Sequence, residues 1–154
     1  MCERRFILRG RADRVEQHPD GLILLDYKTG QVATEKQVRI GLAPQLTLLA
    51  AMLRQGKFAG VPAGAVRSVG YVQLKGGETP GEELPIKFKE GAPDQQAEKA
   101  LRRLTELIER FEDESTPYRS LVHPMWSTRY GDYDHLARVR EWSILADDPL
   151  AALV

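Results

Sequence analysis

The stretch GRADRVEQHPDGLILLDYKTG, residues 10–30, decides the fold. Residues 22–25 form a continuous apolar run, which is typical of a strand covered on both faces. The segment 18–21, His-Pro-Asp-Gly, predicts a tight turn, because proline presets the first central position and glycine tolerates a positive φ. Residues 4–17 alternate well enough to predict a strand before this turn. The stretch therefore predicts two adjacent strands joined by a short loop.

The turn also predicts how the two strands pair. A two-residue loop at Pro19 and Asp20 puts Asp13 opposite Asp26, with Cβ atoms roughly 5 Å apart. A three-residue loop that includes Gly21 as a bulge shifts the pairing by one residue and separates the faces of the two acids. Two carboxylates that close repel each other unless a cation lies between them. The register is therefore a test of whether the two acids form a metal site.

The two acids have the chemistry of a Mg²⁺ site. Mg²⁺ prefers hard oxygen ligands and is usually held by one or two carboxylates together with water and substrate phosphate. The backbone carbonyl of Tyr27 is a further candidate ligand. Lys28 points to the same side of the strand as Asp26, because alternate residues share a face. From there its ammonium would position the attacking water and stabilise the phosphate in the transition state.

The rest of the chain predicts an α/β fold. Helical spacing of apolar residues predicts a helical region over residues 35–55, with the main helix running from about Ala43 to just before Gly56. Residues 66–74 alternate as a strand, residues 84–88 predict a short strand, and a helix follows up to about Phe111 with Asp94 as its N-cap. From Thr116 onward the chain predicts an irregular tail that packs on the domain. This order predicts a small mixed sheet flanked by helices.

Composition predicts one domain over residues 1–154, with 22 basic and 22 acidic residues. Zero net charge gives no general sign of a nucleic-acid-binding protein, although arginines gather around the first strand. Cys2 is the only cysteine, which excludes an internal disulfide or a multi-thiolate site and fits a reducing, cytoplasmic location. No apolar run approaches the roughly 20 residues of a membrane span, so we expect no membrane partner.

The motifs around Asp13 and around Asp26 and Lys28 resemble the core of the PD-(D/E)XK nuclease superfamily, and most closely its RecB/AddB-type C-terminal nuclease branch. The resemblance implies a restriction-endonuclease-like core and a Mg²⁺-dependent site of Asp13, Asp26 and Lys28, in which Mn²⁺ can substitute. It also implies a role for Gln45, which matches the glutamine of a Gln-x-x-x-Tyr motif on the next helix. Leu49 stands in place of the motif's tyrosine.

Two features depart from that family. Its members carry a further metal ligand on a helix before the first strand, and Glu3 lies too close to that strand to serve. Some relatives hold an iron–sulfur cluster with four cysteines, which a chain with Cys2 alone cannot do. We therefore expect the C-terminal fragment of a longer helicase–nuclease subunit, lacking its upstream helix and prone to self-association, with an AddA-like subunit as its partner.

Two functions are consistent with these residues. The first is a Mg²⁺-dependent DNA exonuclease domain of a helicase–nuclease that processes double-strand breaks, with Arg11, Arg14 and Lys36 as candidate contacts to DNA phosphates. The alternative is a non-catalytic DNA-channel or subunit-docking module with an incomplete nuclease site.

Overall fold

The computed structural model describes residues 6–76 and 80–117, which contain four strands and three helices. In chain order they are β1 (Arg14–His18), β2 (Gly21–Lys28), α1 (Glu35–Arg39), α2 (Gln45–Arg54), β3 (Val66–Leu74), β4 (Gly81–Pro85) and α3 (Pro93–Glu112). The chain divides after Glu109 into two units, and the sheet, α1 and α2 belong to the first. Glu3 and the predicted irregular tail beyond residue 117 lie outside the described residues. No helix in the described part has the length and apolar character needed to cross a membrane.

The four strands form one mixed sheet in the order β1-β2-β3-β4. β1 and β2 pair antiparallel, β2 and β3 parallel, and β3 and β4 antiparallel. The parallel pair is joined through α1 and α2, which provide the crossover that parallel neighbours need. The prediction of a mixed α/β fold with a small sheet and flanking helices is confirmed.

The hairpin between β1 and β2 has the register that a two-residue loop requires. His18 pairs with Gly21 and Arg14 with Leu25, and Asp13 directly precedes β1 next to this last pair. Gly21 has a φ of 137° and an added Cβ would stand 2.8 Å from the carbonyl oxygen of Ala65, so the turn needs glycine here. The register prediction is confirmed, and it brings the first candidate acid beside the end of β2.

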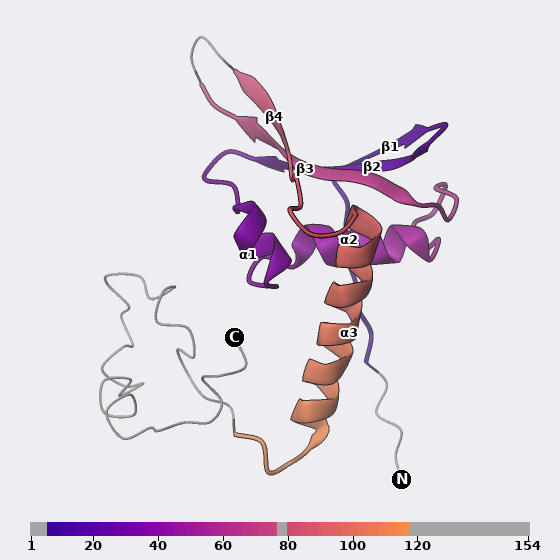
Figure 1. The fold of residues 1–154 in the computed structure, drawn as a ribbon, viewed down its shortest axis with the longest axis vertical. Coiled ribbons are helices and arrows are strands. Elements are labelled where there is room, and N and C mark those ends of the chain that lie inside the picture. Colours follow the sequence, from indigo (N-terminus) through magenta and orange to yellow (C-terminus); the bar gives the residue numbers. More distant parts are fainter. Residues whose placement is uncertain (1–5, 77–79, 118–154) are drawn as a thin grey trace, which may run out of the picture. The chain divides into compact units, whose positions relative to one another are not determined.

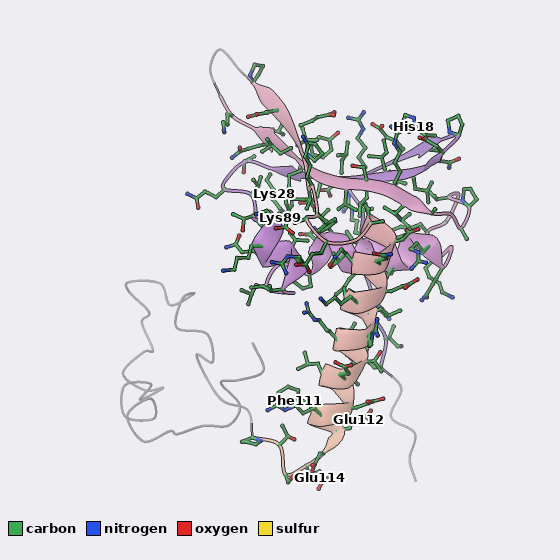
Figure 2. All side chains as sticks on the ribbon, viewed as in Figure 1. His18, Lys28, Lys89, Phe111, Glu112 and Glu114 are labelled. Atoms are coloured by element: carbon green, nitrogen blue, oxygen red, sulfur yellow. The ribbon has the colours of Figure 1, made fainter. Side chains whose placement is uncertain are left out.

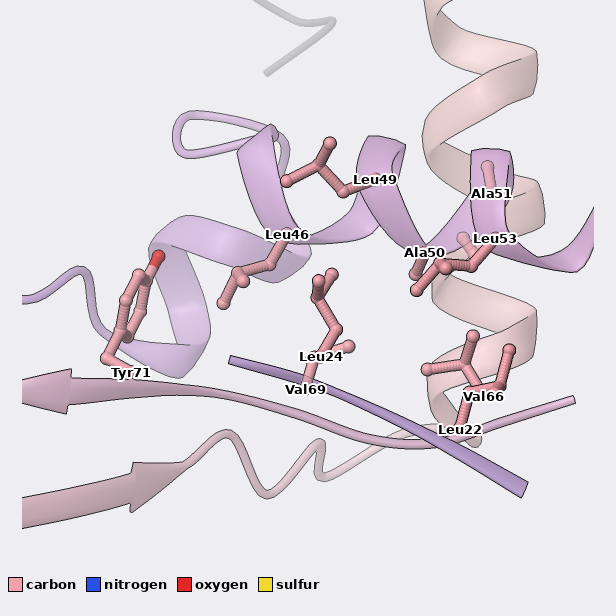
Figure 3. Packing of buried hydrophobic residues seen from close by; sticks show 11 residues of the cluster. Leu22, Leu24, Leu46, Leu49, Ala50, Ala51, Leu53, Val66, Val69 and Tyr71 are labelled. Atoms are coloured by element: carbon pink, nitrogen blue, oxygen red, sulfur yellow. The ribbon is translucent and has the colours of Figure 1, made fainter. Parts of the chain in front are cut away.

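The hydrophobic core lies between one face of the sheet and α2 (Figures 1 and 3). Leu24 of β2 and Leu46 of α2 are fully buried, and Val69 of β3 packs with them. Burying such side chains stabilises the fold by about 1.5–3 kcal/mol each. The core thus fixes β2 and α2 relative to each other, and these are the two elements that carry the candidate site.

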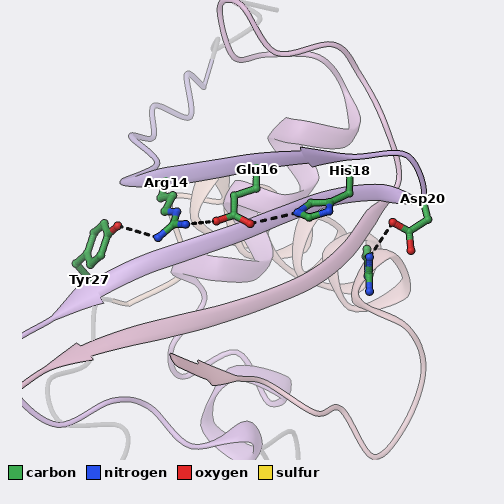
Figure 4. Close-up of polar contacts among 6 residues, drawn as sticks. Arg14, Glu16, His18, Asp20 and Tyr27 are labelled. Carbon is green, nitrogen blue, oxygen red and sulfur yellow. Dashed lines mark hydrogen bonds and ion pairs between the residues drawn. The ribbon is translucent and has the colours of Figure 1, made fainter. Parts of the chain in front are cut away.

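The opposite face of the sheet carries polar side chains at β1 and the end of β2. Arg14, Glu16 and His18 follow one another along this face, with Tyr27 beside Arg14 (Figure 4). The apolar run of β2 was predicted to be covered on both faces, but in the described residues helices cover only one (Figure 1). Leu25 on the other face is still only 5% exposed.

The segment before β1 differs from the prediction. The strand was predicted over residues 4–17, but it begins at Arg14, and residues 6–13 have no regular structure. Gly10 lies directly against α2, where an added Cβ would stand 2.7 Å from Leu49 and 3.1 Å from the sulfur of Met52. This part of the chain therefore packs on the helix instead of extending the sheet.

The remaining differences concern element boundaries. The helical region splits because α1 ends at Arg39 and the chain turns through Gly41 (φ 85°) before α2 begins at Gln45. β4 covers residues 81–85 instead of 84–88. Asp94 was predicted as the N-cap of α3, but the helix begins one residue earlier, and the Asp94 carboxylate instead accepts the N–H of Val66 at 2.8 Å. A tertiary hydrogen bond to β3 therefore uses the side chain that was expected to cap the helix.

Candidate active site

Asp26, Lys28 and Gln45 form a closed set of contacts at the end of β2. Asp26 Oδ1 accepts a hydrogen bond from Gln45 Nε2 at 2.5 Å, and Asp26 Oδ2 lies 2.6 Å from Lys28 Nζ. Lys28 Nζ in turn donates to Gln45 Oε1 at 3.3 Å. The structure thus brings together one acid, one ammonium and one amide that the sequence had singled out separately.

Backbone geometry explains this convergence. Asp26 and Lys28 lie on the face of β2 that carries Leu22 and Leu24, because alternate residues share a face. That face packs on α2, and Gln45 is the first residue of that helix. The turn before α2 is fixed at Gln37, whose carbonyl accepts the N–H groups of both Leu42 and Ala43.

The two charged members of this set differ sharply in exposure. The Asp26 side chain is 2% exposed and that of Lys28 is 36% exposed, at the end of β2 where the chain turns toward α1 (Figure 2). A buried carboxylate is costly unless it is paired and hydrogen-bonded. The ammonium supplies the pairing charge, and its exposed side leaves an approach from solvent.

Asp13 is hydrogen-bonded to the strand that carries Asp26 and Lys28. Its Oδ2 accepts a hydrogen bond from the backbone N–H of Tyr27 at 3.1 Å, and its side chain is exposed. In a strand the N–H and C=O of one residue point to the same neighbour. The carbonyl of Tyr27 therefore faces the same edge of β2 as the carboxylate of Asp13.

The oxygen atoms at this site fit a hard divalent cation. Asp26 Oδ2 is buried and receives no hydrogen bond, although the Lys28 ammonium lies close to it. Buried polar atoms are nearly always hydrogen-bonded, so this oxygen, whose recorded contact is the ion pair with Lys28, is a candidate ligand. Within the described residues no group of three or more His, Cys, Asp and Glu side chains gathers in one place. The protein ligands available here are two carboxylates and a carbonyl, a set that suits Mg²⁺.

Two residues of β3 that sequence reasoning did not select also face this site. The parallel register sets Tyr71 beside Asp26 and Gln73 beside Lys28. Tyr71 is 2% exposed, and burial, followed by the negative charge of Asp26, raises the pKa of its phenol above 10.0. The signal was present in the predicted strand over residues 66–74, but only the pairing with β2 identifies which of its residues adjoin the site.

The three predicted DNA-contacting residues have different environments. Arg11 and Lys36 are exposed, and Lys36 belongs to α1. The Arg14 guanidinium donates to the Tyr27 hydroxyl at 3.4 Å and contacts Glu16 (Figure 4). The hydrogen bond to Tyr27, followed by the charge of Glu16, raises the pKa of Arg14 above its ordinary value. Arg14 thus already has partners on the outer face of the sheet, whereas Asp26 and Lys28 lie on the inner face.

Comparisons with known proteins identify the family of the chain. A model of the PD-(D/E)XK nuclease superfamily matches residues 1–124. An uncharacterized protein of Rickettsia bellii is 28% identical over 142 residues, which are 82% of this chain and 16% of that protein. An uncharacterized protein of Rickettsia conorii is 42% identical over 50 residues, covering 32% of this chain and 6% of that protein. The chain thus spans about a sixth or less of the length of these curated relatives. No solved structure matches the chain.

Proposed function

Because this chain belongs to the PD-(D/E)XK nuclease superfamily, we propose that it is a metal-dependent DNA exonuclease domain whose site consists of Asp13, Asp26, Lys28 and Gln45. The observation that carries the proposal is the closed contact set of Asp26, Lys28 and Gln45. Hydrolysis of a phosphodiester needs a positioned water and stabilisation of negative charge on the phosphate. This set supplies an ammonium and a buried carboxylate within contact distance of each other.

Each residue has a distinct task in this proposal. Asp26 and Asp13, with the carbonyl of Tyr27, would hold Mg²⁺ or Mn²⁺. When bound, the metal supplies Lewis-acid polarisation of the phosphate and lowers the pKa of bound water. Lys28 donates hydrogen bonds toward the attacking water and the phosphate oxygens from its exposed side. Gln45 fixes both Asp26 and Lys28, since its amide donates to one and accepts from the other.

The substrate and the wider context are part of the same proposal. Exposed Arg11 and Lys36 are candidates for contacts with DNA phosphates, and Arg14 would have to leave Tyr27 and Glu16 to join them. The curated relatives are several times longer than this chain, which is consistent with a nuclease domain inside a larger protein. The motif resemblance favours a helicase–nuclease that processes double-strand breaks together with an AddA-like subunit.

Nuclease assays on single-stranded and duplex DNA test the activity. Purified chain should degrade DNA with Mg²⁺ or Mn²⁺ and not with EDTA, and Asp26→Ala should abolish degradation. Asp20→Ala is a matched control, because Asp20 lies in the β1–β2 turn and pairs with exposed Arg67. Equal cleavage by the wild type and Asp26→Ala would refute the assignment of the site.

Metal binding is tested separately by thermal unfolding. A ligand that binds only the folded state raises the melting temperature. Mg²⁺ or Mn²⁺ should therefore raise it for the wild type and much less for Asp13→Asn. A rise of equal size in both proteins would place the metal elsewhere.

One observation favours the non-catalytic alternative. The described residues bring only two carboxylates to the site and no third acidic, histidine or cysteine side chain. A docking module with an incomplete site predicts DNA binding without cleavage under every metal tested. The same nuclease assay, combined with a filter-binding measurement, separates the two functions.

A further inference from the structure

We propose that Gln73 of β3 is a positioning residue for Lys28. Its side-chain Nε2 donates a hydrogen bond of 2.7 Å to the backbone carbonyl of Gly30, two residues beyond Lys28. The inference rests on the proposed function in so far as Lys28 takes part in the reaction. The contact itself stands independently of any activity.

The pairing of β2 and β3 places Gln73 where it can act on Lys28. The two residues are register partners in the parallel pair, so their side chains lie on the same face of neighbouring strands. On its other side β3 pairs with β4, where Gln73 stands opposite Glu82. Because β3 is hydrogen-bonded on both edges, Gln73 projects from a rigid part of the sheet.

The turn that Gln73 contacts has little else to hold it. β2 ends at Lys28, and Thr29 and Gly30 are both exposed. An added Cβ on Gly30 would meet no atom within 4 Å, so nothing packs on the side-chain position of this residue. The Gln73 amide therefore fixes the main chain immediately after Lys28.

Two sets of contacts thus determine where the ammonium lies. Asp26 and Gln45 hold Nζ itself, at 2.6 Å and 3.3 Å. Gln73 holds the carbonyl of Gly30, two residues beyond Lys28, where β2 ends. The Lys28 side chain is long, flexible and one-third exposed, so its position depends on contacts at both of its ends. Small displacements of a group in an active site lower the rate steeply, so the brace should matter for turnover.

Gln73→Leu and Gln73→Glu test the proposal. Leucine is similar in size and has no donor, and ionised glutamate keeps the shape of glutamine but can only accept. Gln17→Leu is the matched control, because Gln17 is an exposed glutamine on β1, opposite Leu22 at the other end of β2. Far-UV circular dichroism and melting temperature verify that each variant folds.

The first readout is independent of nuclease activity. Acetylation of the native protein by a small reagent, followed by mass spectrometry, gives the rate at Lys28 relative to exposed Lys57. Loss of the brace should raise the relative rate at Lys28 about threefold or more in Gln73→Leu, which adds no charge beside the lysine, and leave it unchanged in Gln17→Leu. Equal relative rates in the wild type and folded Gln73→Leu would overturn the proposal, whether or not the chain cleaves DNA.

The second readout is the kinetics of DNA cleavage. Both Gln73 variants should lower kcat about tenfold with KM within about twofold, because the loss concerns a group that acts in the transition state. Unchanged kcat in folded variants would likewise overturn the positioning role. An inactive wild type would count against the proposed function alone, since the acetylation rates still decide the role of Gln73.

Discussion

Replacing Lys28 with methionine removes the only positive charge that, among the described residues, contacts the Asp26 carboxylate, which is 2% exposed. Methionine keeps much of the aliphatic stem, so the change isolates the ammonium. In metal-free buffer Asp26 then keeps the hydrogen bond from Gln45 on Oδ1, and Oδ2 has neither a hydrogen bond nor an ion pair among the described residues. We expect the variant to be folded and less stable than the wild type.

The magnitude follows from the exposure of the two partners. Breaking a fully buried ion pair by removing one partner costs about 3–5 kcal/mol, whereas an exposed pair contributes about 0–1 kcal/mol. With one partner buried and the other 36% exposed, the loss should be about 2 kcal/mol. For a chain of this size that corresponds to a melting temperature about 4–8 °C lower.

Urea denaturation in EDTA, followed by far-UV circular dichroism, measures this loss. Lys57→Met is the matched control, because Lys57 is exposed and its replacement should leave stability within about 0.5 kcal/mol. The double variant Asp26→Asn/Lys28→Met should recover part of the loss, because it buries no unpaired charge. Measuring Asp26→Asn alone completes the double-mutant cycle, and the loss in the double variant minus the losses in the two single variants gives the coupling energy.

Two results would refute this reasoning. If Lys28→Met unfolds at the same urea concentration as Lys57→Met, the ammonium does not stabilise the buried carboxylate. The second result concerns the free energies of unfolding in the double-mutant cycle. If the loss in the double variant equals the sum of the losses in Lys28→Met and Asp26→Asn, the two residues are not coupled, and the contact set does not act as a unit.

Three further predictions concern residues around the site. Gly10→Val should displace the segment that leads to Asp13, because a Cβ there would stand 2.7 Å from Leu49. Titration calorimetry should then show weaker binding of Mg²⁺ or Mn²⁺ than in the wild type, and an unchanged affinity would contradict this prediction. Asp94→Asn should cost about 1–2 kcal/mol in urea denaturation, because the carboxylate accepts the N–H of Val66 and pairs with an arginine; no loss would mean that the contact is replaced by water. The raised pKa of Tyr71 stabilises the fold below about pH 10, and that contribution is lost as the pH rises through the folded-state pKa. Wild type should therefore lose stability more steeply than Tyr71→Phe above about pH 10, and parallel pH curves for the two proteins would refute it.

Local patterns predicted the part of the fold that depends on sequence neighbours. The turn at Pro19 and Asp20 identified the register of the hairpin, and alternation identified β3 with its correct bounds. The boundaries that were wrong depend on contacts between distant segments. Residues 6–13 do not extend the sheet, because Gly10 packs on α2. Asp94 does not cap α3, and its carboxylate accepts a hydrogen bond from the N–H of Val66 in β3.

The residues of the candidate site likewise fall into those that local patterns identify and those that only contacts between distant segments identify. Asp13, Asp26 and Lys28 were identifiable because their spacing around one turn fixes their geometry. Gln45 was identified by resemblance, since no local pattern shows which side of a helix meets a strand end. Tyr71 and Gln73 were missed because their place beside Asp26 and Lys28 depends on the parallel pairing of β2 and β3, which brings together residues far apart in sequence.

The ion pair between Lys28 and Asp26 has a consequence for the order of events in the life of this protein. A domain whose buried acid depended on a divalent cation for neutralisation would stay unfolded until it met that cation, as small zinc domains do. Here the lysine already occupies the role of counter-ion, so maturation does not have to wait for cation supply. Under the proposed function, folding and cation loading are therefore separable steps, and starving cells of magnesium or manganese should lower activity while leaving the amount of folded protein unchanged.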